Sequence, residues 1–402
     1  MINIFCSSIY NMEEYEMLKA KSKVNLSLAD HNFNYNIIKG LDAHTRNGTL
    51  LVNSVPLPSY PSFPKIFMKK QHWKHHPEKQ EADINIGCIN LPVLKQISRY
   101  FTCCRALQKI IRSNPNEKIN ILVYDLHLPL VKAIVRMKKK FPRINTCAVL
   151  PDIPDTMIHV VFGEHPSKAA RYYTQAKMNM INSFDCYVFV TELMKEKVDV
   201  RSKPYTVVEG IYDERFPVSE SAGETGKSVI LYSGALREAY GVKRLAELIA
   251  GMNDPQYELW LCGGGELSGY LTEMAQKHQN IRYFGYLTSD KIHELQQQAT
   301  VLINPRKNDA EYTKYSFPSK TMEYLASGKP VIGYLLDGYP QEYVSFINCP
   351  EDESDKALIE KIVEVCSLPK EIRQERGRES REFILNQKNP KAQCEKIIKM
   401  LD

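Results

Sequence analysis

The stretch from Tyr315 to Ile332 carries the residues with the clearest chemical potential, because a short helical pattern there ends just before an apolar strand. The N-terminus of a helix presents unpaired N–H groups and a positive dipole end, which attract anions. Lys320 adds a positive charge in the first turn, and Glu323 lies about one turn further on. The pattern therefore predicts an anion site, although an ordinary helix that leads into a strand would have the same pattern.

The predicted helix has suitable residues at both ends. Ser316 or Ser319 can cap its free N–H groups, and Pro318 suits a first turn, where a missing N–H is tolerated. Gly328 suits the left-handed conformation that commonly follows a helix. The helix is thus expected to lie between Pro318 and Gly328.

A second set of polar residues follows two apolar runs in the N-terminal half. Asp125 and His127 come after the first run, and Asp152 and Asp155 come after the next. Ligands of parallel α/β sheets bind outside the carboxyl ends of the strands, so these side chains are candidates for a reactive site. Asp152 and Asp155 each follow a proline, and aspartate also favours such turns for conformational reasons alone.

Two basic runs interrupt the chain. The first contains Lys69 and Lys70 in a segment rich in histidine, and the second extends from Arg136 to Lys140 at the end of a predicted helix. The histidines lack carboxylate and cysteine partners at metal-site spacing, and nucleic-acid binding is weakly supported. Lysines at a helix C-terminus also complement its dipole. A solvated face or an anionic membrane surface remains the favoured interpretation.

The composition is that of a globular protein. The chain has 402 residues, of which 43% are hydrophobic and 25% charged, with a net charge of +6 and a pI near 8.6. This length suits two domains. No stretch approaches the roughly 18 apolar residues of a membrane span, and the first residues do not resemble a signal peptide. The ten cysteines are expected to be reduced, so a cytoplasmic location is predicted.

Strand-like and helix-like segments alternate along both halves of the chain. This alternation predicts an α/β protein with two Rossmann-like domains, each built on a doubly wound parallel sheet. The expected division is an N-terminal domain at 1–212, a linker at 213–227, a C-terminal domain at 228–385, and a last helix at 386–402 that can cross back to the N-terminal domain.

Six short motifs follow one another in the C-terminal half. They are Tyr-Ser-Gly-Ala-Leu at 232–236 with Gly241, Leu-Cys-Gly-Gly-Gly-Glu at 261–266, Phe-Gly-Tyr at 284–286, Ile-Asn-Pro at 303–305, Phe-Pro-Ser-Lys at 317–320 and Glu-Tyr-Leu-Ala-Ser-Gly-Lys-Pro-Val at 323–331. In this order they resemble glycosyltransferase family 4, whose members are retaining enzymes of the GT-B fold. The subtype is similar to bacterial capsule, exopolysaccharide and lipopolysaccharide glycosyltransferases.

The resemblance implies that the enzyme, of hexosyltransferase type, moves a sugar from a UDP- or GDP-sugar to a glycan or lipid-linked acceptor in cell-surface polysaccharide synthesis. It implies an N-terminal acceptor domain and a C-terminal donor domain that face each other across a cleft. No cofactor, no metal and no nucleic-acid partner are expected. The protein would act in the cytoplasm, at the inner face of the cell membrane, with Lys69–Lys70 and Arg136–Lys140 toward anionic lipid.

The resemblance also transfers roles to individual residues. The catalytic candidates are Asp152, His127, Arg237 and Lys320. The donor-binding candidates are Gly234, Gly264, Gly265, Tyr286, Arg306, Tyr315, Ser316, Phe317, Pro318, Ser319, Lys320 and Glu323. Arg237, Arg306 and Lys320 are expected to neutralise the leaving diphosphate, which needs positive charge and N–H donors. Glu323 matches the family glutamate that binds the ribose.

Three positions depart from the family pattern. The family's E-x7-E motif has a glutamate that contacts the donor sugar, where this chain has Tyr315. Tyr240 precedes Gly241 where lysine is usual, and Arg237 can substitute from a nearby position. A family histidine is absent beside Asp152, so Asp152, or His127 at the neighbouring strand end, can orient the acceptor or the donor sugar.

Three alternative functions remain. A non-catalytic sugar-nucleotide-binding partner subunit of the same fold is favoured by Tyr315, and a nucleotide-sugar epimerase would need a different carboxylate and histidine set. An NAD-linked enzyme requires a G-x-G-x-x-G turn after the first strand and an acidic residue about 20 residues further on. The glycines at 263–265 come late in the chain and lack that acidic partner.

Overall fold

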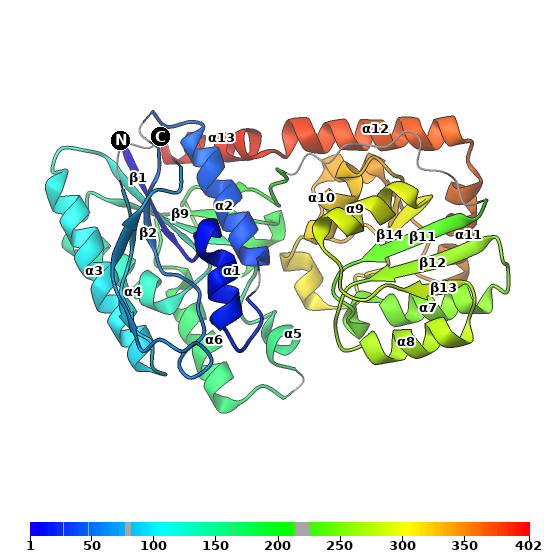
Figure 1. The fold of residues 1–402 in the computed structure, drawn as a ribbon. Helices are drawn as coiled ribbons and strands as arrows, with labels where there is room; N and C mark the ends of the chain where they lie inside the picture. Colours follow the sequence, from blue (N-terminus) through cyan, green and yellow to red (C-terminus); the bar gives the residue numbers. More distant parts are fainter. Residues whose placement is uncertain (27, 47, 77–81, 164, 214–225) are drawn as a thin grey trace. The chain divides into compact units, whose positions relative to one another are not determined.

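The computed structural model describes residues 1–26, 28–46, 48–76, 82–163, 165–213 and 226–402. These residues form two compact units (Figure 1): unit 1 is Met1–Ile211 with Asn389–Asp402, and unit 2 is Tyr212–Lys388. Most of the predicted linker at 213–227 lies outside the described residues. Each unit is an α/β domain on a mainly parallel sheet, which confirms the predicted fold class of two Rossmann-like domains.

Unit 1 contains an eight-stranded sheet in the order β10-β9-β8-β7-β1-β2-β5-β4. Its strands are β1 (Ile2–Ser7), β2 (Leu50–Asn53), β4 (Gln71–Trp73), β5 (Asp83–Asn85), β7 (Ile119–Tyr124), β8 (Asn145–Leu150), β9 (Cys186–Phe189) and β10 (Tyr205–Val207). All neighbouring strands are parallel except β4 and β5. A separate antiparallel pair consists of β3 (Phe67–Met68) and β6 (Cys88–Ile89).

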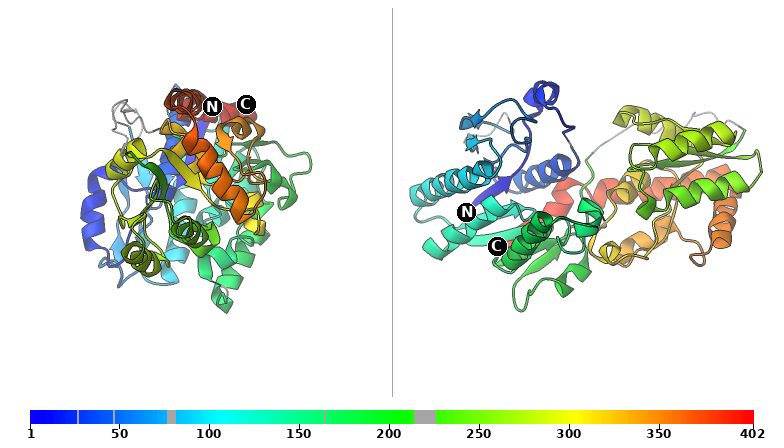
Figure 2. Two further views of the ribbon diagram at one scale, coloured as in Figure 1. Left: turned by 90° about the vertical axis from the view of Figure 1, so that its right-hand side faces the viewer. Right: turned by 90° about the horizontal axis from the view of Figure 1, so that it is seen from below.

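Helices flank this sheet (Figures 1 and 2). They are α1 (Met12–Lys21), α2 (Ala29–Asp42), α3 (Leu94–Ser113), α4 (Leu128–Lys140), α5 (Ile158–Phe162), α6 (Lys168–Ile181) and α13 (Pro390–Leu401), with a 3-10 helix at Glu192–Glu196. α2 packs against α13, and α3 packs against α4. Side chains of central parallel strands are buried on both faces of a covered sheet, and all six residues of β7 are buried here.

The last helix packs on unit 1. Ile37 of α2 and Ile397 of α13 share one core with Phe5 of β1. The two helices approach closely because of Gly40, where a Cβ would lie 2.2 Å from the carbonyl oxygen of Pro390. A larger residue at Gly40 would therefore push α13 away from the sheet.

Unit 2 contains a six-stranded, fully parallel sheet in the order β13-β12-β11-β14-β15-β16. Its strands are β11 (Ser228–Ser233), β12 (Tyr257–Cys262), β13 (Ile281–Tyr283), β14 (Val301–Asn304), β15 (Val331–Gly333) and β16 (Ile347–Asn348). Its helices are α7 (Val242–Gly251), α8 (Ser268–Lys277), α9 (Ser289–Gln298), α10 (Ser319–Ala326), α11 (Asp355–Ser367) and α12 (Lys370–Gln387), with 3-10 helices at Glu238–Tyr240, Glu311–Tyr315 and Gln341–Phe346.

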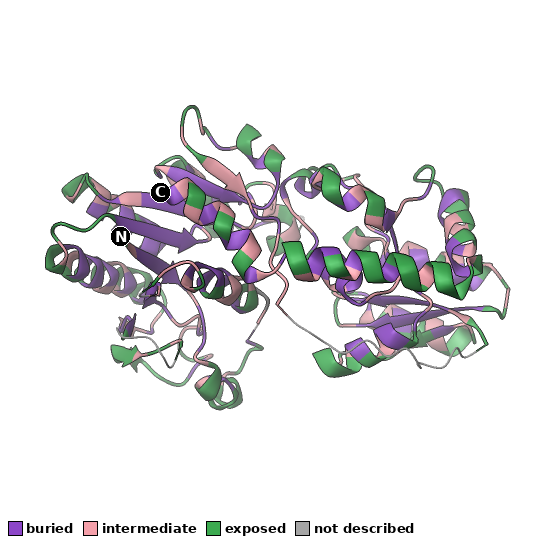
Figure 3. Cartoon of the chain, turned by 90° about the horizontal axis from the view of Figure 1, so that it is seen from above, coloured by how far each residue is buried: buried purple, intermediate pink, exposed green. Residues whose placement is uncertain are grey.

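Alternate residues of β11 serve two different cores. Ile230 packs in a core with α7, α8 and α11, whereas Leu231 packs in a core with α10 and α12. The period of two along a strand sends neighbouring side chains to opposite faces, so each face of the sheet carries its own helix layer. Figure 3 shows the result, with buried strands in purple and exposed outer helix faces in green.

The histidine-rich segment differs in part from the prediction of a solvated face. The imidazole of His75 is 3% exposed and lies between two carboxylates, with its Nε2 2.7 Å from Asp42 and its Nδ1 2.7 Å from Asp83. These partners come from α2 and β5, so no spacing within the segment could reveal them. Lys69 and Lys70 are exposed, as predicted.

Candidate functional site

Helix α10 is held at the carboxyl end of the unit 2 sheet by Tyr324. The Tyr324 hydroxyl accepts a hydrogen bond from the backbone N–H of Ser233 at 2.8 Å and donates one to the Ser233 carbonyl oxygen at 2.9 Å. Ser233 ends β11, directly before Gly234. Tyr324 is fully buried, so this contact fixes where α10 lies beside the strand end.

The start of α10 corrects the predicted capping. Pro318 occupies the capping position itself, and no side-chain hydrogen bond caps the helix. A serine caps from that position, but Ser319 is already the first helical residue. The Ser316 hydroxyl is buried and has no hydrogen-bond partner in the described part of the chain. The N–H groups of the first turn thus have no capping side chain, a condition that leaves them able to bind an anion.

Lys320 and Glu323 form the polar centre of α10. Lys320 Nζ lies 2.6 Å from one carboxylate oxygen of Glu323, and the amide nitrogen of Gln296 in α9 donates to the other oxygen at 2.9 Å. The Lys320 and Glu323 side chains are 36% and 28% exposed. Both are therefore pre-positioned by protein contacts and still reachable by a ligand.

The three-glycine turn after β12 brings the backbone close to the end of β11. A Cβ on Gly263 would lie 1.8 Å from the carbonyl oxygen of Gly234, and one on Gly265 would lie 2.4 Å from that of Leu236. Gly264 faces open space. Gly263 and Gly265 are thus required by packing of the two turns, which leaves Gly264 as the glycine whose bare backbone a ligand can approach.

Arg306 follows β14 and is held by aromatic rings. Its guanidinium carbon lies 3.9 Å from the centre of the Tyr240 ring and 5.7 Å from that of Tyr312, within the range of cation–π attraction. The guanidinium of Arg237 lies 6.0 Å from the same Tyr240 ring. Arg306 forms no ion pair with a described residue, so its charge is available for an anion.

If a nucleoside diphosphate binds here, as the sequence resemblance implies, Tyr240→Leu is expected to raise its Kd about twofold to thirtyfold, because a cation–π contact contributes about 0.5–2 kcal/mol to holding the guanidinium. Tyr240→Phe keeps the ring and is expected to bind like the parent protein. Isothermal titration calorimetry measures both. An unchanged Kd in Tyr240→Leu would contradict this role for the ring.

The remaining donor-binding candidates occupy different environments. Tyr315 is 5% exposed, and Phe317 packs against Tyr339 and Tyr343 with ring centres 5.2 and 5.1 Å apart. Tyr286 is 83% exposed, next to the left-handed Gly285. Tyr315 and Phe317 thus contribute packing beside α10, while Tyr286 is open to solvent.

Unit 1 contains a cavity of about 630 Å³ at the carboxyl ends of its central strands, which we call the strand-end pocket. Its lining comes from the ends of two strands and from three helices: Tyr124 at the end of β7 with Asp125 and His127 after it, Pro151, Asp152 and Pro154 after β8, Asp30, His31 and Asn34 of α2, Arg99 of α3, and Tyr173, Thr174 and Lys177 of α6, among others. The structure brings the predicted residues His127 and Asp152 into this one pocket. Asp155 is exposed and does not line it.

One of the acidic groups of the strand-end pocket, Asp125, is paired with a lysine. Lys177 Nζ lies 2.8 and 3.0 Å from the two carboxylate oxygens of Asp125. Burial, followed by repulsion from Asp125, raises the pKa of Asp152 to about 6 and also raises the pKa of Asp30. Asp152 has no hydrogen bond or ion pair with another described residue. Its carboxyl group is thus free to bind a ligand hydroxyl.

His127 is neutral in this setting. Burial, reinforced by the charge of Arg99, lowers its pKa to about 3. Nη1 of Arg99 lies 3.4 Å from Nε2 of His127. Because arginine can only donate, Nε2 accepts this hydrogen bond, and the single ring proton of the neutral imidazole resides on Nδ1. Nδ1 is buried and unpaired among the described residues. Asp125, just after β7, has a φ of 54°, a sparsely populated conformation that aspartate tolerates and that occurs at functional sites.

Several pocket residues were not predicted from the sequence. Asp30, Arg99 and Lys177 lie on three different helices. No local motif marks them, and Arg99 would be taken for a surface residue of an amphipathic helix. The one available signal was that ligands gather at parallel strand ends, which identified His127 and Asp152 but not the helices around them.

The pH dependence of stability tests the Asp152 environment. The folded-state pKa of Asp152 is raised, so ionising this carboxyl costs folding free energy. The cost grows between about pH 4 and pH 6, is fully present above pH 6, and is absent below pH 4. Asp152→Asn is therefore expected to raise the Tm by about 3–8 °C at pH 7.5, and to have a much smaller effect at pH 4.5. Differential scanning calorimetry at both pH values, with Asp155→Asn as the matched control, measures this. A Tm gain that is equal at both pH values would contradict it.

Two further findings concern the described residues only. No cluster of three or more His, Cys, Asp or Glu side chains among them is arranged to hold a metal ion. None of their helices combines the length and the apolar character needed to cross a membrane.

A comparison with known protein families found a match, which lies in unit 2. The family model for glycosyl transferases group 1 matches residues 216–383, which include α10, the three-glycine turn and Arg306. No curated protein sequence matches the chain.

Solved structures resemble the whole chain. Sucrose-phosphate synthase from Thermosynechococcus elongatus superposes with a TM-score of 0.66 at 14% identity, covering 100% of this chain and 98% of that one. The apo structure of OtsA gives 0.65 at 13% identity, covering 100% and 99%, and apo lipopolysaccharide outer core galactosyltransferase WaaB gives 0.60 at 13%, covering 100% and 99%. The likeness shows the GT-B fold, and the group 1 match covers most of unit 2.

Proposed function

We propose that this chain is a retaining, family 4-type glycosyltransferase that moves a hexosyl group from a UDP- or GDP-sugar to a glycan or lipid-linked acceptor in cell-surface polysaccharide synthesis. One observation carries the proposal: Arg306, Lys320 and Glu323 stand at the carboxyl-end turns of unit 2, inside the segment matched by the group 1 model. Ligands of parallel sheets bind at such ends.

Unit 2 supplies the donor site in this proposal. Lys320, Arg306 and the free N–H groups of α10 bind the diphosphate and stabilise the negative charge that grows on it as it departs. Glu323 accepts hydrogen bonds from the ribose hydroxyls in exchange for its present partners Lys320 and Gln296. Gly264 gives the ligand access to the backbone.

Unit 1 supplies the acceptor site. The unpaired carboxyl of Asp152 accepts a hydrogen bond from an acceptor hydroxyl, and the Lys177–Asp125 pair offers further polar contacts. The acceptor oxygen bonds to the anomeric carbon on the face from which the diphosphate oxygen departs, and the acceptor proton passes to the departing diphosphate. The chemistry requires no protein nucleophile, no metal ion and no cofactor.

A location at the inner face of the cell membrane forms part of the proposal. Lys69 and Lys70 are exposed, as are Arg136, Lys139 and Lys140 near the end of α4. Exposed cations attract anionic lipid headgroups, an attraction that falls off within a Debye length.

A second candidate is a non-catalytic partner subunit that binds a nucleotide sugar. Tyr315 favours it, because a tyrosine that is 5% exposed replaces the family carboxylate that contacts the donor sugar. Such a subunit would bind nucleotide but would neither transfer nor hydrolyse the donor.

A nucleotide panel tests both candidates. The Tm is measured with UDP, GDP and ADP, and one of them is expected to stabilise the protein by about 2.7 kcal/mol at a hundredfold excess over its Kd. Sugars of that nucleotide are then assayed for transfer, and the anomeric configuration of the product is read by NMR. Absence of any nucleotide effect would overturn the proposal, binding without turnover would leave the partner subunit, and an inverted product would exclude retention.

A further inference from the structure

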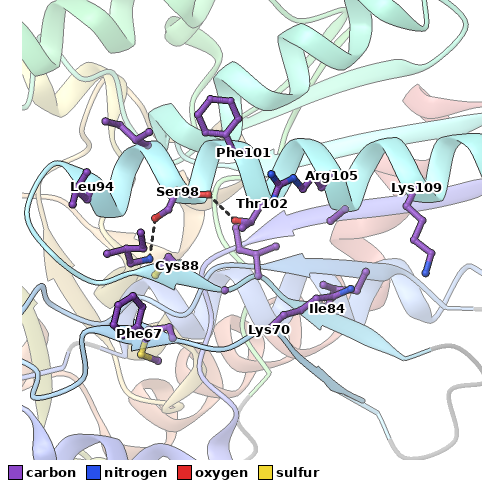
Figure 4. A pocket seen from close by; sticks show the side chains of 16 residues that line it. Phe67, Lys70, Ile84, Cys88, Leu94, Ser98, Phe101, Thr102, Arg105 and Lys109 are labelled. Carbon is purple, nitrogen blue, oxygen red and sulfur yellow. Dashed lines mark hydrogen bonds between the residues drawn. The ribbon is translucent and has the colours of Figure 1, made fainter.

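Unit 1 has a second cavity, of about 770 Å³, between α3 and the strands β3 and β6. Figure 4 shows it from close by, with α3 along one side and the strand segments along the other. We call it the α3 pocket. It shares no lining residue with the strand-end pocket, and the proposed transfer reaction does not use it.

Contacts between α3 and the strands build this pocket. The hydroxyl of Ser98 accepts a hydrogen bond from the backbone N–H of Ile89 at 3.0 Å, which ties α3 to β6. Gly87, directly before β6, lets its own backbone approach β3 closely, since a Cβ there would lie 2.7 Å from the carbonyl oxygen of Met68. The walls are therefore set by specific packing contacts.

The lining is apolar and unusually open to water. Phe67 is 72% exposed, and Leu94, Ile97 and Phe101 are each between 45% and 49% exposed. Leu94, Ile97 and Phe101 are spaced three and four residues apart, so they form a stripe along α3. An exposed apolar patch of this kind commonly marks a binding surface, because covering it removes the cost of hydrating it.

The other end of the α3 pocket is cationic. Lys70, Arg105 and Lys109 line it, and no described lining residue is acidic. None of these three cations forms an ion pair with a described residue. In Figure 4, Leu94 and Phe67 lie toward one end of the pocket and Arg105 and Lys109 toward the other. A pocket with one apolar end and one cationic end suits a ligand that has an apolar part and an anionic part.

Packing also places the second basic run beside α3. Arg136 of α4 donates a hydrogen bond to the hydroxyl of Tyr100 at 2.9 Å, and Lys140 donates to the side-chain oxygen of Gln108 at 3.3 Å. Tyr100 and Gln108 are both in α3. Lys70 and the run from Arg136 to Lys140, distant in sequence, therefore both adjoin α3, and the apolar stripe lies on the same helix.

We propose that the α3 pocket takes up a hydrocarbon chain of an anionic phospholipid, whose phosphate is bound by Lys70, Arg105 and Lys109, and that unit 1 thereby docks on a membrane surface. The proposal deepens the membrane location of the proposed function and rests on it. The apolar contact attracts the lipid chain at any salt concentration. The attraction between the three cations and the phosphate weakens as salt is added.

Vesicle co-sedimentation tests the proposal with two lipid compositions, phosphatidylcholine alone and phosphatidylcholine mixed with phosphatidylglycerol. The parent protein is expected to bind the mixed vesicles much more tightly than the neutral ones. Arg105→Gln with Lys109→Gln is expected to weaken binding about 25-fold, since each cation near an anionic surface contributes about a fivefold effect. Lys21→Gln with Lys168→Gln, which removes the same charge from exposed sites elsewhere on unit 1, is the control and should have a small effect.

The apolar wall is tested separately. Ile97→Ser with Phe101→Ser is expected to weaken vesicle binding about tenfold or more in both low and high salt, because less apolar surface is buried in the lipid. Tyr172→Ser, at a residue 80% exposed on α6, is the matched control. All substituted residues are exposed or half-buried, so the variants should fold, and their circular dichroism and Tm are compared with the parent.

The outcomes separate this inference from the proposed transfer reaction, because UDP and GDP binding are measured on the same variants and should be unchanged. Absence of binding to any vesicle overturns the inference and leaves the donor site untouched. The inference is also overturned if the wall variants bind vesicles like the parent while neutralising Arg136 and Lys140 abolishes binding. Surface charge alone would then explain the membrane attachment. The parent protein could instead self-associate through the wall residues. Its mass in solution would then rise with concentration, and Ile97→Ser with Phe101→Ser would abolish that rise. This result would assign the pocket to a second copy of the chain and would also overturn the inference.

Discussion

Lys320→Ala is expected to lower kcat/KM for the nucleotide sugar by about 100- to 1,000-fold, the usual effect of removing one group that stabilises the charge of a departing oxyanion. The expectation rests on the first turn of α10, where Lys320 stands beside N–H groups that no side chain caps. Steady-state transfer assays measure the effect. The loss should fall mainly on kcat, because the charge on the diphosphate grows in the transition state.

The chain offers a matched control for this substitution. Lys291 and Glu294 in α9 form an ion pair with the same three-residue spacing, at 2.7 Å, but their side chains are 62% and 56% exposed. Lys291→Ala removes an equivalent helix pair and is expected to leave kcat/KM unchanged. Comparable losses in Lys291→Ala and Lys320→Ala would mean that Lys320 acts through helix stability, and the proposed diphosphate role would be wrong.

Asp152→Asn is expected to reduce sugar transfer about 100-fold or more while leaving the Kd for UDP or GDP unchanged, because Asp152 lies in unit 1 and the nucleotide is assigned to unit 2. Asparagine keeps the shape but presents a weaker hydrogen-bond acceptor than a carboxylate. Transfer assays and calorimetric nucleotide titrations on one preparation measure the two quantities.

Asp155→Asn controls for the turn in which Asp152 lies. Asp155 belongs to the same proline-rich turn after β8 but is exposed and outside the strand-end pocket. The substitution is expected to leave transfer within about twofold, as exposed sites away from special features usually do. Equal activity of the Asp152→Asn and parent proteins would remove Asp152 from the acceptor site and make His127 the leading candidate there.

The two Asp152 predictions point in opposite directions for stability and activity. The half-buried carboxyl of Asp152, close to Asp125, makes the folded protein less stable at neutral pH, and the same carboxyl is expected to bind the acceptor. Such a combination is typical of functional sites, where a group is retained despite its cost to folding.

The sequence alone determined the local features of this protein. Alternating apolar strands and amphipathic helices specified two parallel-sheet domains, because the periods of 2 and 3.6 residues are local properties of the chain. The position of α10, with Lys320 and Glu323 one turn apart, followed for the same reason. Its capping did not, because proline took the position that a serine needs.

Only the tertiary structure decided which distant residues meet. The order of strands in the sheet places β7 between β1 and β8, and this order brings Asp30, Arg99 and Lys177 from three helices around His127 and Asp152. The same holds for His75 between its two carboxylates and for the cations of the α3 pocket. Contacts between separate elements depend on how their apolar faces pack, and no spacing along one segment encodes that.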